Sequence, residues 1–146
     1  MTARAILKTP GSAGGTVVSD YTVLMDLLAA EPAALIEVAR AGLPAGTIPV
    51  LARAMGCSQD YLLEVLDFKR ATALRKMREG ANLTTAETER LLGLASLIHL
   101  AGEVVQHTGG PADFDAAEWF SDWIEQVNPA LGSVPPADLL DTHHGQ

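Results

Sequence analysis

The sequence has little cysteine, few aromatic residues and no long apolar run, and each shortage excludes a class of protein. Its 146 residues include one cysteine, Cys57, which excludes an internal disulfide framework and favours a reducing compartment. No stretch of about 18 uninterrupted apolar residues occurs, so no membrane span is expected. The first residues lack the charged start and apolar core of a secretory signal peptide. We therefore expect a cytoplasmic protein that does not enter the membrane.

Basic residues are absent from the last third of the chain. Residues 1–102 hold 10 basic and 10 acidic residues, whereas residues 103–146 hold 8 acidic residues and no basic ones, and so carry the whole net charge of −8. An acidic segment of this kind repels a phosphate backbone and suits a basic partner protein. Solubility of a small domain is the alternative explanation, and charge alone does not decide between the two.

The composition favours an all-α protein. Alanine and leucine dominate, and glycine and proline lie mostly between segments with helical periodicity. Residues 1–19 show no lasting period and are expected to form a mobile arm. The periodicity then predicts helices at 20–30 and 32–41, the second opened by Pro32 and ended by Gly42.

The segment Ile48–Phe68 has the pattern of a helix-turn-helix, which needs a small residue where the helices cross and a glycine in the turn. Ala52 is the small residue, and Gly56 follows four positions later. The second helix is expected at Ser58–Leu66. The apolar residues that would lock it onto the first are Leu51, Met55, Cys57, Leu62 and Val65. A plain helical hairpin is the alternative.

Polar and basic residues in and after this segment are candidates for DNA contact. Ser58 and Gln59 would hydrogen-bond base edges, whereas Asp60 and Glu64 would oppose phosphate contact. Five of the 10 basic residues follow within ten positions, namely Lys69, Arg70, Arg75, Lys76 and Arg78. Such a cluster contacts phosphates without selecting a sequence, although a solvated helix face has the same composition. The predicted DNA-binding residues are Ser58, Gln59, Lys69, Arg70, Arg75 and Lys76.

A long helix is predicted at Thr85–His107. Thr84 and Glu87 form a capping box at its start, and Gly109-Gly110-Pro111 ends it. Its apolar residues extend well beyond a single stripe, so the helix must be covered on two sides. The N-terminal helices, a second subunit or the next helix would supply this cover, and the second of these predicts a homodimer. Gly93 and Gly102 inside the helix suggest close approach of another helix.

The segment Phe114–Gly145 holds four of the seven aromatic residues. Asp115 can cap a helix, with Glu118 at the N3 position. Its expected apolar stripe consists of Ala116, Trp119, Phe120, Trp123, Ile124 and Val127. Asn128-Pro129 should end the helix, and Pro135-Pro136 should open a short helical turn.

No residue pattern indicates catalysis. Cys57 falls at an inner position of the helix-turn-helix, where a structural thiol is expected rather than a nucleophile. His143 and His144 lie near Asp138 and Asp141, but adjacent histidines without a spaced partner set do not make a designed metal site. We therefore expect no enzyme activity, no cofactor and no metal.

The order Trp, Asn-Pro-Ala-Leu-Gly, Pro and Leu-Leu-Asp-Thr ahead of Gly145 resembles the toxin-binding domain of the Xre/MbcA/ParS antitoxins. The segments Lys69–Lys76 and Leu83–Leu91 also match, and the resemblance covers Gly42–Gly145. Two departures are the longer loop at Gln106–Asp113 and the end at Gln146, where the family usually continues with one more helix.

The resemblance implies an antitoxin of a RES-domain toxin, an enzyme that destroys NAD. It implies an Xre-like helix-turn-helix domain at 20–82, for autoregulation on operator DNA, and a small helical toxin-binding domain at 83–146 that covers the toxin's active site. The predicted toxin-binding residues are Trp119, Trp123, Leu131, Asp138, Leu139, Leu140, Asp141 and His143. The alternative is a stand-alone helix-turn-helix regulator whose C-terminal domain dimerises or senses another molecule.

Overall fold

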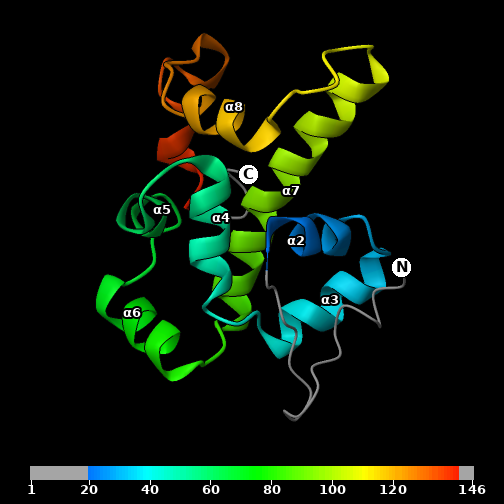
Figure 1. The fold of residues 1–146 in the computed structure, drawn as a ribbon. Coiled ribbons are helices and arrows are strands. Elements are labelled where there is room, and N and C mark those ends of the chain that lie inside the picture. Colours follow the sequence, from blue (N-terminus) through cyan, green and yellow to red (C-terminus); the bar gives the residue numbers. More distant parts are fainter. Residues whose placement is uncertain (1–19, 142–146) are drawn as a thin grey trace.

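The computed structural model describes residues 20–141, and this part of the chain folds into helices without named strands (Figure 1). The elements are α2 (Tyr21–Leu28), α3 (Pro32–Ala41), α4 (Thr47–Met55), α5 (Gln59–Val65), α6 (Arg70–Glu79), α7 (Thr85–His107), α8 (Ala116–Trp123) and the 3-10 turns η1 (Pro129–Leu131) and η2 (Pro136–Leu139). The expected all-α class is confirmed. The arm expected at 1–19 lies outside the described residues. No helix between residues 20 and 141 is long and apolar enough to cross a membrane.

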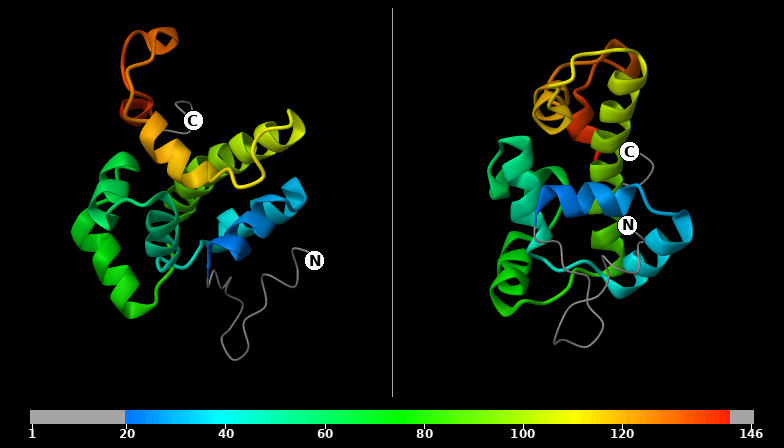
Figure 2. Two further views of the ribbon diagram at one scale, coloured as in Figure 1. Left: turned by 45° about the horizontal axis from the view of Figure 1, so that its top comes forward. Right: turned by 45° about the vertical axis from the view of Figure 1, so that its right-hand side comes forward.

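Helix α7 forms the axis of the fold, and α2, α3 and α8 all pack against it (Figures 1 and 2). Its N-terminus is the predicted capping box. The Thr84 hydroxyl accepts a hydrogen bond from the Glu87 N–H at 3.1 Å, and Glu87 Oε1 accepts one from the Thr84 N–H at 2.9 Å. These bonds satisfy donors that the first turn of the helix leaves free, so the sequence pattern located the start of α7 correctly.

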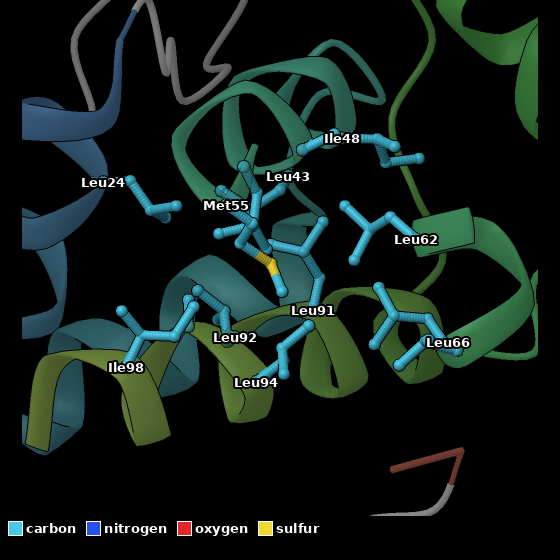
Figure 3. Packing of buried hydrophobic residues seen from close by; sticks show 14 of the residues in the cluster. Leu24, Leu43, Ile48, Met55, Leu62, Leu66, Leu91, Leu92, Leu94 and Ile98 are labelled. Carbon is cyan, nitrogen blue, oxygen red and sulfur yellow. The ribbon is translucent and has the colours of Figure 1, made fainter. Parts of the chain in front are cut away.

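One hydrophobic core connects the N-terminal and C-terminal parts of the chain. Leu24, Ile48, Leu62 and Leu91 are fully buried members of this core and come from four different helices (Figure 3). The same cluster contains Phe120, Ile124 and Leu140 from the C-terminal part, and α4 packs directly against α8. The parts predicted at 20–82 and 83–146 therefore share a core. Removing residues 1–80 would expose apolar surface on α7 and α8, so single substitutions test their roles more cleanly than truncation does.

Helix α8 is shorter than predicted, because its chain turns back at Ile124. The Ile124 carbonyl accepts a hydrogen bond from the Ala137 N–H at 2.9 Å, and the Asn128 N–H donates to the Val134 carbonyl at 3.1 Å. The helix therefore ends at Trp123, and Val127 is 62% exposed. The expected single apolar stripe is wrong: Ala117, Phe120 and Ile124 are buried, whereas Trp119 is 43% exposed.

Two glycines lie where another segment of the chain passes nearby, but only one of these positions requires glycine. Gly42 has a φ of +81°, and a side chain there would clash with the Leu83 carbonyl oxygen, so the α3–α4 link can lie closely against the start of α7 only with glycine. At Gly102 a Cβ atom would lie 3.5 Å from the Ala116 Cβ atom, which is ordinary contact. Helix α8 does approach Gly102, as expected, but alanine would also fit there.

Lys76 ties α6 to the capping box of α7. Its Nζ lies 2.6 Å from Glu87 Oε1, and the two side chains are only 12% and 14% exposed. Burial alone would raise the pKa of Glu87, but hydrogen bonds from Lys76 and Thr84 outweigh burial and hold the pKa below its usual value. The ionised carboxylate therefore stabilises the folded chain.

We expect Glu87→Ala to lower the free energy of unfolding by roughly 2 kcal/mol, because it removes half of the capping box and leaves Lys76 unpaired. Urea denaturation measures this loss. Glu79→Ala is the matched control, since the Arg75–Glu79 pair is 51% exposed on both sides and should contribute at most about 0.5 kcal/mol.

The same carboxylate makes stability depend on pH. Because the pKa of Glu87 is lower in the folded chain than in the unfolded chain, its contribution is present above the unfolded pKa and is lost as the pH falls through the folded pKa. Glu87→Gln should therefore flatten the acid side of the stability profile. Equal losses in the Glu87 and Glu79 variants, or an unchanged acid limb, would contradict this role.

Candidate functional site

An apolar groove of about 640 Å³ lies between the C-terminal half of α7, helix α8 and the segment that follows. We call it the α7–α8 groove. Its lining includes Leu97, Leu100 and Val104 from α7, Phe114, Trp119 and Trp123 from or next to α8, and Leu131, Leu139 and Leu140 from the terminal segment. In Figure 1, α7 extends beyond α2–α6, and the loop at its far end leads back to α8, which packs against α7.

The groove collects exposed apolar side chains. Leu100 is 58% exposed, Val104 53%, Trp119 43% and Leu131 38%, and these are four of the six large hydrophobic residues exposed between residues 20 and 141. Clustered exposure of this kind marks an interaction surface, whereas scattered single residues do not. Within the described residues, the buried side chains of α7 therefore all lie in its first four turns.

Aromatic rings form one wall of the groove. Trp119 and Trp123 lie one turn apart on α8 and stack with their ring centroids 5.8 Å apart and an angle of 14° between the planes. Phe114 packs against Trp119 at 5.9 Å, and the buried Phe120 packs against Trp123 at 5.6 Å. Because these rings support one another, the wall loses little side-chain freedom when a partner binds.

The terminal segment closes the other side of the groove. Asn128 Oδ1 accepts a hydrogen bond from the Ala130 N–H at 2.9 Å, and the pairing of Asn128 with Val134 closes the loop around η1. Leu140, which is 2% exposed, anchors the end of η2 in the core. Ordered backbone contacts thus present Leu131 and Leu139 to the groove.

The structure separates the predicted toxin-binding residues into two groups. Trp119, Trp123, Leu131, Leu139 and Leu140 all line the α7–α8 groove. Asp138 and Asp141 instead line a neighbouring hollow of about 370 Å³ that faces α5, together with Glu64, Asp67 and Glu125. His143 lies outside the described residues. Sequence reasoning missed the α7 side of the groove, although the all-round apolar pattern of that helix was the signal for it.

The helix-turn-helix element is present at α4 and α5. Gly56 ends α4 in the left-handed conformation with a φ of +67°, and the Ser58 hydroxyl caps α5 by accepting a hydrogen bond from the Tyr61 N–H at 3.1 Å. Arg90 of α7 fixes the far end of α5, since it donates hydrogen bonds to the carbonyls of Leu66 and Asp67 at 2.7 and 3.1 Å. The element is rigid at both ends.

The exposed surface of α5 and of the turn that follows it is acidic. Gln59, Asp60, Glu64 and Asp67 are exposed, whereas Leu63, on the same short helix, is buried. Asp60 pairs with Arg70 at 2.8 Å. This face alone offers one amide and three carboxylates to a nucleic acid, so phosphate attraction must come from neighbouring residues.

The predicted DNA-binding residues differ in whether they already pair with other side chains of the chain. Lys76 is held in its buried pair with Glu87, and Ser58 serves as an N-cap. Arg70 and Arg75 are exposed but pair with Asp60 and Glu79. Within residues 20–141, the exposed side chains of Lys69, Arg78 and Gln59 make no ion pair or side-chain hydrogen bond. Lys69 and Arg78 are therefore the cations best placed to meet a phosphate.

No catalytic or metal-binding arrangement is found in the described part of the chain. Cys57 is half-buried, and burial raises the pKa of its thiol, which favours the protonated form over the thiolate. No group of three or more His, Cys, Asp or Glu side chains between residues 20 and 141 is arranged to hold a metal ion.

Comparison with known proteins decides the family. The family model described as the antitoxin Xre-like helix-turn-helix domain matches residues 34–96. The Prs ADP-ribosylating antitoxin of Sphingobium sp. (strain YBL2) is 38% identical over 120 residues, which cover 82% of this chain and 76% of that protein. The chain is an Xre-type antitoxin. No solved structure gives a significant match.

The helix-turn-helix element lies within the region that the family model matches, and the α7–α8 groove lies after it. Residues 34–96 include α4, α5 and the first half of α7, which confirms the helix-turn-helix interpretation over a plain hairpin. The α7–α8 groove is lined by residues 97–140, so it lies wholly after the matched region. The antitoxin therefore carries a surface that its helix-turn-helix domain does not account for.

Proposed function

We propose that this antitoxin neutralises a RES-domain toxin by binding it through the α7–α8 groove and covering its active site. The observation that carries the proposal is the groove itself, in which exposed side chains of α7, α8 and the terminal segment form one apolar surface. Aromatic residues backed by buried neighbours are the usual anchors of such interfaces. The terminal motif that resembles the toxin-binding domain supplies Trp119, Leu131 and Leu139 to this surface.

The charge around the groove supports a basic partner. Residues 91–141 contain no lysine or arginine, whereas Glu103, Glu118, Asp122 and Glu125 are exposed on α7, on α8 or just beyond it. A toxin cleft that holds the pyrophosphate of NAD must be cationic, and carboxylates of the antitoxin would occupy the same electrostatic site. The Sphingobium relative is named for ADP-ribosylation, a reaction that transfers part of NAD, which fits a toxin of this class.

Asp138 and Asp141 remain the candidates for direct pairing with toxin arginines. They lie at and after η2, just beyond the groove, and no described lysine or arginine pairs with either of them. In this arrangement the groove supplies apolar anchoring and the adjacent carboxylates supply charge-assisted hydrogen bonds.

We expect Trp119→Ala to weaken toxin binding by roughly 2 kcal/mol, about 30-fold in Kd, because it removes the exposed ring of the aromatic wall. Titration calorimetry with the co-purified toxin measures the change. Val127→Ala is the matched control, since Val127 is 62% exposed but lies outside the groove. Equal effects of the two substitutions, with unchanged helix content, would remove the groove from the proposal.

A second proposed function is repression of the antitoxin's own operon. The rigid α4–α5 element and the exposed cations Lys69, Arg75 and Arg78 favour it. The acidic face of α5 and the hollow formed with Glu125, Asp138 and Asp141 oppose it in the free chain. Toxin bound at the C-terminal part would cover or neutralise these acids, so we propose weak operator binding alone and tighter binding in the toxin complex.

Two sets of substitutions should separate phosphate contact from base recognition in the toxin complex. Replacing Lys69 and Arg78 by alanine should weaken binding to all DNA sequences alike and lower the salt slope by about 2. Gln59→Ala should instead reduce the preference for operator over scrambled DNA. Fluorescence anisotropy over a range of salt concentrations measures both effects. Equal operator affinity with and without toxin would contradict the proposed coupling.

A further inference from the structure

Two walls of the α7–α8 groove are apolar faces of helices. Leu97, Leu100 and Val104 line the groove from α7 at intervals of three and four residues, which places them on one side of that helix. Trp119 and Trp123 line it from α8 and lie four residues apart. Each wall therefore has the spacing with which a helix normally packs against another helix.

The groove has a covered floor and a defined length. Phe120 and Leu140 line it and are only 3% and 2% exposed, so they close its base. Leu97 and Val104 are seven residues apart on α7, which corresponds to two helical turns and roughly 10 Å. An occupant that lies along the groove would thus contact α7 on one side and α8 on the other over about two turns.

The walls offer few backbone partners to an extended peptide. Inside α7 and α8 the N–H and C=O groups are bonded within each helix. In the terminal segment Pro136 has no N–H, and the Ala137 N–H already donates to the Ile124 carbonyl at 2.9 Å. A strand laid on this surface would leave its own N–H and C=O groups unpaired against apolar side chains, which is costly.

The aromatic wall does not suit a proline-rich segment either. Such segments dock on aromatic-lined grooves. The rings of Trp119 and Trp123 stack on each other, with 5.8 Å between their centroids and 14° between their planes. Because each ring covers a face of the other, no slot remains between the two rings for a proline.

We propose that the α7–α8 groove receives an amphipathic helix of the toxin, with basic residues beside its apolar stripe. This inference rests on the proposed function, because it takes the toxin as the occupant. A helix bonds its own backbone groups, so it can enter an apolar groove without leaving them unpaired. Apolar residues at positions i, i+3 or i+4, and i+7 of that helix would match the two turns of the α7 wall.

The charges on α8 indicate which residues flank the stripe. Glu118 and Asp122 are exposed, lie four residues apart, and each directly precedes a tryptophan of the groove. Neither forms an ion pair with a described lysine or arginine. Lysine or arginine beside the apolar stripe of the incoming helix would pair with this row of carboxylates, whereas acidic residues there would be repelled.

Photo-crosslinking in the purified antitoxin–toxin complex identifies the toxin segment. The photoreactive residue p-benzoylphenylalanine, placed at Leu100 on α7 or at Trp119 on α8, should crosslink to the same short segment of the toxin. Placed at Val127, which is exposed outside the groove, it should not reach that segment.

Substitutions in the crosslinked toxin segment then determine its conformation. Alanine should lower the affinity tenfold or more at residues three or four positions apart, and little at the residues between them. A proline on the polar side of the segment's centre should lower the affinity more than alanine at the same position, because proline breaks a helix. Circular dichroism of the toxin alone checks its fold, and the alanine pattern decides the matter if the proline variant does not fold.

The basic flanks have a test of their own. The double variant Glu118→Gln with Asp122→Asn should bind the toxin about tenfold more weakly at low salt, and its affinity should depend less on salt. Asp26→Asn is the matched control, since Asp26 is exposed on α2 and does not line the groove.

The outcomes separate this inference from the proposed function. If neither Leu100 nor Trp119 crosslinks to the toxin, the groove does not bind it, and both are overturned. Crosslinks from the groove combined with losses at every second toxin residue, or with a tolerated proline, would keep the toxin in the groove but overturn the helix. Unchanged affinity in the double variant would overturn the basic flanks.

Discussion

The structure depends on one constraint, which is that α7 is apolar around most of its circumference and must be covered. Within the chain, α2, α3 and α8 pack against it. Leu100 and Val104 near its C-terminal end remain exposed. A helix that the chain cannot enclose by itself provides a place where another protein can complete the core.

This arrangement explains how a small protein can hold separate surfaces without separate domains. The capping box and the Lys76–Glu87 pair fix α7 relative to α6, and Arg90 fixes it relative to α5. Helix α7 therefore connects the helix-turn-helix element rigidly to the α7–α8 groove. Glu125 and Asp138 lie beside α5, so a partner bound at the groove would change the charge near that helix without a change of fold.

Local sequence patterns predicted the elements well and their contacts less well. The bounds of α3 and α7 followed from Pro32, Gly42 and the Thr84 capping box, because each acts through nearby backbone atoms. The early end of α8 depended on the bond between Ala137 and Ile124, which no local pattern contains. Burial of Lys76 likewise depended on where α6 meets α7. The aromatic and leucine residues of the groove were predicted, but its α7 wall required the fold.

Hydrogen exchange of the antitoxin with and without its toxin tests the central claim most directly. If the α7–α8 groove receives the toxin, amide protection should rise in residues 97–104, 119–124 and 131–140. It should stay unchanged in residues 35–40 and 85–96, which lie outside the groove. Protection confined to α5 and α6, or spread evenly along α7, would contradict the assignment of the toxin to this groove.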